Sequence, residues 1–380
     1  MSPTAFSMTP RERLEHRALR SLSALPGPLQ TRLSGRAPIV LDGDTLAPDI
    51  QLMISLLERL EPAAQPLDPE STRRERRRMA RICDGPPVAV AAVSDLTIDA
   101  PHQLRARHYA PPEPGGRHPL MVFLHGGGFT FGDLDTHDGV CRMLCRHAGM
   151  HVLAIDYRLA PEHPFPAAVE DARRALAFAH EHAGALGADP QRVAIGGDSA
   201  GGNLAAVAAQ IAKADGGPGA AMQMLIYPST DISRRWPSRD LFGKGFLLTD
   251  TEMDWFRRNY LGHNGADRHD PRLSPMVAPD LGGLPPALVA TAAFDPLRDE
   301  GEAYGLALRS AGTPVVLRRF PGLIHGFISI AGVSRVCRDA VIEIAGATRA
   351  LLNAVPAGAE PSAGPGIEDA GLRGAGDALG

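Results

Sequence analysis

Cysteine is scarce in this chain, and charge of neither sign dominates. Four cysteines occur in 380 residues, and no two of them form a Cys-x-x-Cys pair. Cys141 and Cys145 lie four residues apart in a predicted helix, where packing is a more natural role than a disulfide, so cysteine usage fits a reducing compartment. The formal net charge of −4 gives no electrostatic reason to expect nucleic acid or an anionic membrane as a partner.

Long apolar runs are also missing. No stretch of about 18 apolar residues could span a membrane, and residues 1–20 lack the apolar core of a signal peptide. We therefore expect no membrane span and a cytoplasmic location. The one basic run, residues 73–78 with Arg81, is interpreted as the solvated face of a helix whose apolar face carries Met79, Ile82 and Cys83, and not as a nucleic-acid or targeting patch.

From residue 88 onward, short apolar runs alternate with helical patterns. The strand candidates are residues 88–98, 104–109, 119–125, 151–157, 192–197, 222–227, 287–294 and 315–320. Helical patterns follow most of them, at 137–148, 167–182, 199–213, 299–311 and 334–353. This alternation predicts an α/β protein with a mainly parallel sheet that helices cover on both faces. The first two strands have no helix between them, so we expect an antiparallel hairpin at one edge.

Several segments lie outside this alternation. Residues 1–45 are rich in proline and arginine, and an extended cap, a dimer contact and a disordered arm are all open as their role. Two helix patterns follow, at 50–60 and 70–83. A longer insertion with a helix near 249–261 separates two late strands, and the tail 355–380 has an Ala-, Gly- and Pro-rich composition that predicts disorder.

The clearest chemical signal is the pentapeptide Gly-Asp-Ser-Ala-Gly at residues 197–201. It follows the apolar run 192–195 and precedes a helical pattern, so Ser199 is expected at a strand-to-helix turn with its hydroxyl held out of the strand end. The small neighbours allow a sharp turn and a close approach of strand and helix. Glycine and serine clusters are also ordinary turn material, so the assignment of a nucleophile depends on its partners.

A nucleophilic serine needs a base, and that base needs an acid to hold its tautomer. In folds with this serine turn the chain order is serine, acid, histidine. Three histidines follow Ser199, and only His325 is also preceded by a carboxylate at a strand end; it lies in a glycine-bounded loop after the last strand candidate. His263 and His269 fall in the polar insertion, where we expect surface roles.

The acid is predicted to be Asp295, which directly follows the apolar run 287–294. Asp299 and Glu300 come slightly later, where they would open the next helix and meet the positive end of its dipole. We therefore interpret Asp295 as the orienting acid of His325 and Asp299 as a helix-start residue.

An anion site is predicted at residues 125–128, which read His-Gly-Gly-Gly after the apolar run 120–124. Three glycines leave backbone N–H groups unobstructed, and no phosphate-loop pattern such as G-x-x-x-x-G-K-[ST] is present. Together with the serine pentapeptide, this loop predicts an oxyanion hole whose donors are the N–H groups of Gly127, Gly128 and Ala200. His125 is expected to shape the loop by hydrogen bonding and not to act as a second base.

At this point the chain resembles the bacterial hormone-sensitive-lipase-like family of α/β-hydrolase esterases, in the branch with GDSAG around the nucleophile. The similarity runs from about Leu46 to Gly332. It rests on residues 125–129 (HGGGF), 156–162 (DYRLAPE), 197–202 (GDSAGG), 295–301 (DPLRDEG) and 325–327 (HGF).

The resemblance implies the α/β-hydrolase fold, an eight-stranded, mostly parallel sheet flanked by helices, with a helical cap over the serine. The cap would come from residues 46–86 and the insertion 231–285, and the catalytic domain would span 87–354. The family implies hydrolysis of short- to medium-chain acyl esters through an acyl-enzyme, with small-molecule esters as partners and without metal or cofactor. It also hints at a homodimer.

Two alternatives stay open on the sequence alone. The same three residues could serve an amidase, a lactonase or a deacetylase, because the leaving group and the pocket decide between esters and amides. A non-catalytic ligand-binding member of the fold is the alternative from another class. The presence of Ser199, Asp295 and His325 together argues against it.

Overall fold

The computed structural model describes residues 8–60, 68–99, 102–113, 117–262 and 265–354. Its centre is an eight-stranded sheet with the spatial order β10-β9-β8-β7-β5-β6-β4-β3. The strands are β3 (Ala92–Ile98), β4 (Leu104–Ala110), β5 (His118–Leu124), β6 (His151–Asp156), β7 (Ala188–Asp198), β8 (Gln223–Ile226), β9 (Ala287–Phe294) and β10 (Val315–Ile324). β3 pairs antiparallel with β4, and β4 with β6, while the other pairs are parallel. The predicted mostly parallel sheet and its edge hairpin are confirmed.

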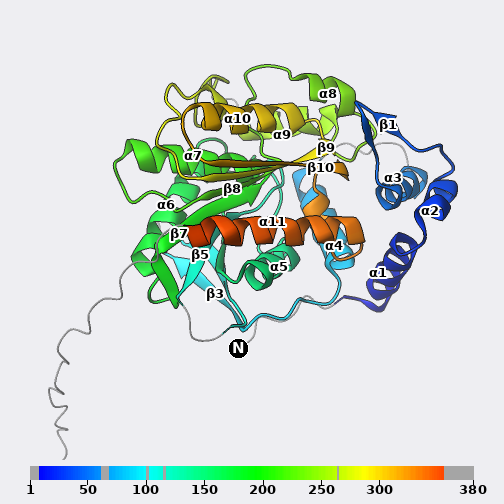
Figure 1. The fold of residues 1–380 in the computed structure, drawn as a ribbon, viewed down its shortest axis with the longest axis horizontal. Helices are drawn as coiled ribbons and strands as arrows, with labels where there is room; N and C mark the ends of the chain where they lie inside the picture. Colours follow the sequence, from blue (N-terminus) through cyan, green and yellow to red (C-terminus); the bar gives the residue numbers. More distant parts are fainter. Residues whose placement is uncertain (1–7, 61–67, 100–101, 114–116, 263–264, 355–380) are drawn as a thin grey trace, which may run out of the picture.

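Helices cover both faces of the sheet, as Figure 1 shows. Alternate side chains of β5 point to opposite faces, so Met121 and Phe123 join one apolar cluster while Leu120 and Val122 join the other. The first cluster includes side chains of α5 (Asp138–Ala148) and α11 (Arg335–Ala354). The second includes side chains of α6 (Ala167–His182), α7 (Ala200–Ala214) and α10 (Arg298–Ser310). Burial on both faces explains why the central strands read as continuous apolar runs.

Several predicted strand boundaries were wrong by a few residues. β3 begins at Ala92 and not at residue 88, whereas β7 already begins at Ala188. β10 continues to Ile324, beyond the predicted end at residue 320, and pairs there with Phe294 after a register shift. The ends of these strands depend on where they pair with a neighbouring strand, which cannot be read from the composition of the segment.

The N-terminal segment is helical where the structure describes it. The helices α1 (Pro10–Ser23) and α2 (Gly27–Ser34) were not predicted, and neither was the hairpin of β1 (Val40–Leu41) and β2 (Asp44–Thr45). They precede α3 (Pro48–Leu60) and α4 (Pro69–Asp84), which the sequence did predict. The ring of His16 on α1 is hydrogen-bonded to the carbonyl of Ile82 on α4, at 2.8 Å. Residues 10–34 are thus ordered helices packed on the following helices, not a disordered arm.

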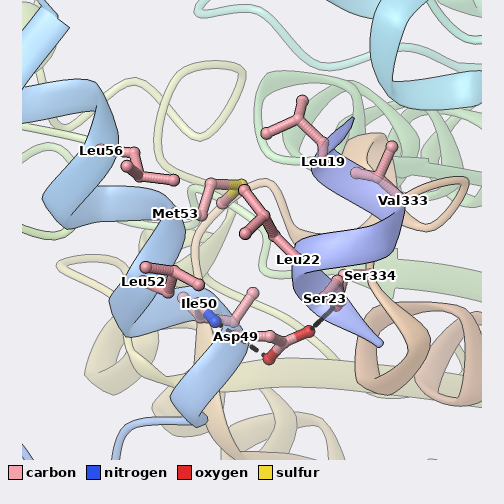
Figure 2. Close-up of a pocket in the computed structure, with 10 residues that line it drawn as sticks. All are labelled: Leu19, Leu22, Ser23, Asp49, Ile50, Leu52, Met53, Leu56, Val333 and Ser334. Atoms are coloured by element: carbon pink, nitrogen blue, oxygen red, sulfur yellow. Dashed lines mark hydrogen bonds between the residues drawn. The ribbon is translucent and has the colours of Figure 1, made fainter. Parts of the chain in front are cut away.

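Figure 2 shows how α1 and α3 meet around a small, mostly apolar cavity. Its polar side is Asp49, whose carboxylate accepts hydrogen bonds from the hydroxyls of Ser23, at 2.8 Å, and Ser334, at 2.7 Å. The N–H of Ile50 donates to the other carboxylate oxygen. Asp49 therefore ties an N-terminal helix to the segment that leads into α11.

The insertion after β8 contains α8 (Pro237–Phe242), which was not predicted, and α9 (Asp250–Leu261), which was. α9 begins with a capping box, in which Thr249 and Glu252 satisfy each other's backbone N–H groups. His263 and the tail 355–380 lie outside the described residues. Among the helices that the structure describes, none is long and apolar enough to cross a membrane.

Replacement of Asp49 by alanine should destabilise the protein. The change leaves two hydroxyls and one backbone N–H without their acceptor, so we expect a loss of about 2–3 kcal/mol in the free energy of unfolding, measured with urea. Glu58→Ala on the same helix removes an exposed ion pair with Arg36 and should cost less than about 1 kcal/mol. Equal losses in the two variants would contradict this role of Asp49.

Candidate active site

Three predicted side chains meet at the carboxyl ends of β7, β9 and β10. The Oγ of Ser199 lies 3.0 Å from Nε2 of His325, and Nδ1 of the same ring lies 2.9 Å from Oδ2 of Asp295. Asp295 is fully buried, and its second oxygen accepts the N–H of Leu297 at 2.8 Å. Parallel strands bring these three loops to one edge of the sheet, although the residues are far apart in the chain.

The ionised acid determines the tautomer of the histidine. Because the carboxylate of Asp295 is an acceptor, Nδ1 of His325 carries the proton that it donates to this acid. Nε2 then presents its lone pair to the hydroxyl of Ser199. The geometry is that of a nucleophile with its base already in hydrogen-bond contact.

The backbone of Ser199 is strained, and the glycines on either side of the turn leave room for this conformation. Its φ of 55° and ψ of −116° lie outside the regions that side chains prefer. A Cβ at Gly197 or Gly201 would overlap the carbonyl oxygen of Leu124 at the end of β5. The flanking glycines are therefore required by close packing against the neighbouring strand, which lifts the serine to the N-terminus of α7.

The glycine loop begins next to this turn, directly after β5. Gly127 and Gly128 have φ values of 122° and 57°, and within the described residues neither N–H donates to a protein acceptor. Ala200 is the first residue of α7, where backbone N–H groups have no partner inside the helix. A Cβ on Gly128 would overlap the ring of Phe256 on α9, so the insertion covers this loop directly.

His125 lies behind the loop. Its Nδ1 is 2.8 Å from the carbonyl of Gly126, and its ring stacks on Tyr157 with 4.2 Å between centroids. Burial, with a further contribution from the charge of His137, lowers the pKa of His125 to about 4. A neutral, buried ring that holds the loop backbone matches the expected shaping role.

The other histidine and acid that the sequence offered as candidates, His269 and Asp299, make no hydrogen bond or ion pair with the three side chains above within the described part of the chain. His269 is exposed and interacts with Asp267 in its own turn. Asp299 lies at the start of α10, as expected, where its carboxylate accepts the N–H of Ser238. Among the described residues, no group of three or more His, Cys, Asp or Glu side chains could hold a metal ion.

The basic run lies on a helix whose apolar face carries Ile82 and Cys83, as expected, but its arginines are not merely solvated. Most of its arginines bind carboxylates on other elements: Arg73 pairs with Glu162, Arg76 with Glu252, Arg77 with Asp133 and Arg78 with Glu15. Arg73 also donates to the carbonyls of Thr130 and Ala160, next to the glycine loop. These carboxylates are distant in sequence, so the ion pairs could not be predicted from the basic run itself.

Two further residues were missed by sequence reasoning. Phe256 covers Gly128 but belongs to an ordinary amphipathic helix pattern. Glu300 was considered only as a helix-start residue, yet it is buried and accepts the N–H of Thr230 at 2.8 Å, at the start of the insertion. Its sequence neighbours at positions 298, 299 and 302 are charged as well, so no local signal singles out Glu300.

Comparison with known proteins places the chain among ester hydrolases. A family model described as the alpha/beta hydrolase fold matches residues 121–329. The carboxylic ester hydrolase LipN of Mycobacterium tuberculosis is 48% identical over 345 residues, which are 89% of this chain and 91% of that protein. The ethyl acetate hydrolase of Pseudomonas putida is 36% identical over 79% of this chain and 97% of its own length.

Solved structures agree with these relatives. A hyperthermophilic esterase from the archaeon Pyrobaculum calidifontis superposes with a TM-score of 0.76 at 39% identity, over 82% of this chain and 99% of that one. The thermostable carboxylesterase EstE1, cloned from a metagenomic library, has a TM-score of 0.72 at 40% identity, over 75% and 98% of the two chains.

Glu300→Gln should change the pH dependence of stability. Burial, reinforced by Asp231, raises the pKa of Glu300 to about 8. Between the ordinary carboxyl range and about pH 8, the folded protein therefore holds a proton that the unfolded chain has released, and stability falls as pH rises. Glutamine can still accept from Thr230 and has no such proton, so the variant should gain melting temperature relative to wild type as pH rises through this window. A difference that is constant across the pH range would contradict the assignment.

Proposed function

Because the chain belongs to the hormone-sensitive-lipase-like family of alpha/beta hydrolases and is a serine carboxylesterase, we propose that Ser199, Asp295 and His325 are its catalytic triad. The observation that carries the proposal is the continuous hydrogen-bonded series from Ser199 through His325 to the buried Asp295. The amidase, lactonase and deacetylase alternatives receive no such support from the relatives, whose names are those of ester hydrolases.

The mechanism follows from the positions of the protons. Nε2 of His325 takes the proton of the Ser199 hydroxyl as Oγ attacks the ester carbonyl, and the imidazolium that forms is stabilised by Asp295. The negative charge moves to the former carbonyl oxygen, where the N–H groups of Gly127, Gly128 and Ala200 are proposed to receive it.

Collapse of this intermediate breaks the bond between the acyl carbon and the alcohol oxygen. His325 donates its proton to the departing alcohol and leaves an acyl group on Ser199. Water then enters, gives a proton to the same Nε2 and attacks the acyl carbon, so the acid is released and the serine hydroxyl is restored. Each step uses the one ring nitrogen that faces the serine.

Phe256 and the α4 arginines support a covering role for the segments 46–86 and 231–285. Phe256 rests on Gly128, and Arg76 joins α4 to α9 by its ion pair with Glu252, at 3.1 Å. Such a cover excludes water from the oxyanion region and strengthens the hydrogen bonds that act there. We propose on these contacts that the two segments form the cap.

The homodimer and the cytoplasmic location stay predictions. β10 is a terminal strand of the sheet and carries an exposed Val316, which is where a second copy could pair. All four cysteines are free and buried, as expected in a reducing compartment.

Covalent labelling tests the nucleophile. A fluorophosphonate should add one adduct to the wild-type protein and none to Ser199→Ala, and the variant should lose at least about 10⁴-fold in kcat. Ser229→Ala is the matched control, because Ser229 follows the next strand and its N–H bonds to the carbonyl of Ser199. It should be labelled like wild type. An undiminished adduct on Ser199→Ala would eliminate this triad.

Substrate preference is proposed to lie with short to medium acyl chains. The relative named for ethyl acetate acts on a two-carbon acyl group and supports the short end of this range. With p-nitrophenyl acetate, butyrate, octanoate and palmitate, we expect kcat/KM to be highest for butyrate or octanoate and to fall about 100-fold for palmitate. The corresponding p-nitroanilides test amide cleavage. Highest activity on palmitate, or on an anilide, would contradict the preference.

A further inference from the structure

Asp198, the residue before the nucleophile, is a buried acid that the triad does not use. Only 4% of its surface is exposed, at the end of β7. Its Oδ1 accepts the N–H of Gly126 at 2.7 Å, and its Oδ2 accepts the hydroxyl of Tyr227 at 3.3 Å. Burial of an ionised carboxylate costs free energy unless a nearby opposite charge or hydrogen bonds compensate for the lost hydration.

Gly126 is the first glycine of the loop that carries the proposed oxyanion donors. A Cβ on Gly126 would overlap Oδ2 of Asp198, so the loop backbone lies directly on this carboxylate. On the other side, the hydroxyl of Tyr157 donates to the carbonyl of His125 at 2.7 Å. The loop is therefore held at its origin by two side-chain hydrogen bonds, and the one from Asp198 joins it to the strand of the nucleophile.

The compensating charge comes from His137, the residue before α5. Its Nε2 lies 3.3 Å from Oδ1 of Asp198, and the ring is nearly fully buried. Its Nδ1 lies 3.0 Å from the hydroxyl of Thr136. The same hydroxyl lies 2.9 Å from the carbonyl of Asp133, which can take its proton and leave an oxygen lone pair for an N–H of the ring.

The carboxylate beside Nε2 of His137 favours the protonated ring, in which both nitrogens are donors. Burial alone would lower the pKa of His137, but the Asp198 carboxylate outweighs burial and raises it, with smaller contributions from Asp133 and Asp84. The same contact keeps the pKa of Asp198 below its usual range despite burial. The neighbouring ring of His125 is neutral, so His137 carries the positive charge of this group.

We propose that Asp198 and His137 form a buried ion pair that positions the oxyanion loop through the N–H of Gly126. Asp198 is the positioning residue, and His137 neutralises it. An uncompensated carboxylate beneath the loop would repel the negative charge that develops on the substrate oxygen. Pairing removes this repulsion and retains a strong, charge-assisted hydrogen bond to the loop. The inference rests on the proposed roles of Gly127 and Gly128.

The first test compares Asp198→Leu with Asp198→Asn. Leucine is similar in size but cannot accept from Gly126, whereas the asparagine carbonyl can. Because loss of one oxyanion donor costs about 10²–10³-fold in kcat, we expect a loss of about 100-fold for leucine and about 10-fold for asparagine, with KM within about 3-fold. Partial rescue by asparagine and an effect confined to kcat separate positioning from general damage.

A trifluoromethyl ketone gives a second readout. Oγ of Ser199 adds to its carbonyl while the hydroxyl proton passes to Nε2 of His325, and the hemiketal oxyanion that forms occupies the proposed oxyanion site. Its inhibition constant should rise in both variants by the same factor as kcat falls. An unchanged inhibition constant would overturn the proposal.

The charge pairing is tested by a double-mutant cycle. His137→Gln leaves Asp198 as an unpaired buried anion and should lower kcat by about 100-fold. In the double variant with Asp198→Asn the anion is gone, so kcat should recover about 10-fold relative to His137→Gln alone. Additive losses in the double variant would contradict the ion pair.

Asp189→Asn is the matched control, because Asp189 is a buried acid at the other end of β7 and pairs with Arg192. Its kcat should stay within about 2-fold of wild type. If Asp198→Leu does not fold, Asp198→Asn and the double variant carry the test. Wild-type kcat in folded Asp198→Asn and in His137→Gln would overturn this inference alone, whereas failure of the wild-type protein to be labelled at Ser199 would overturn the proposed function.

Discussion

The active-site end of this fold depends on one close contact, between the carbonyl of Leu124 and the backbone of the serine turn. No side chain fits at Gly197 or Gly201, because a Cβ there would overlap this carbonyl. The contact places the end of β5 against the start of α7. Since the glycine loop begins one residue after Leu124, the same contact also helps to position the proposed oxyanion donors. The proposed nucleophile and the proposed anion site thus depend on the same packing.

Electrostatics then differentiates the acids around this contact. Asp198 lies 3.3 Å from Nε2 of His137 and has a lowered pKa, whereas Glu300 receives mainly backbone N–H donors and has a pKa raised to about 8. Asp84 is partly exposed, and desolvation raises its pKa to about 7. Desolvation acts on all three carboxyl groups, so the partner sets the direction in which each pKa shifts. Of the three, Asp198, which touches the proposed oxyanion loop, is the one with a histidine ring in direct contact.

The sequence was sufficient for the parts of the site that local chemistry determines. Ser199 and Asp295 lie shortly after apolar runs, His325 lies in a glycine-bounded loop after the last strand candidate, and the chain order leaves one histidine that fits. The parallel sheet then brings the three strand ends together. The sequence was insufficient where tertiary contacts decide. α1 does begin with a capping box, formed by Thr9 and Glu12, that sequence reasoning overlooked. The contact of His16 with Ile82 on α4, however, is not encoded in any local spacing. The partners of the α4 arginines are separated from them by up to 176 residues.

The arginines of α4 add directional hydrogen bonds and ion pairs to the contacts of the proposed cap. A cover held only by apolar contacts would have freedom to slide, because hydrophobic attraction has no direction. Here Arg73 reaches two backbone carbonyls beside the glycine loop as well as Glu162, and its side chain is mostly sheltered from solvent. Directional bonds of this kind fix the register of α4 over the loop. The proposed cap therefore contacts the backbone of the proposed oxyanion loop. Asp198 accepts the N–H of Gly126 at the start of this loop, and Arg73 of α4 donates to the carbonyl of Thr130 just beyond its glycines.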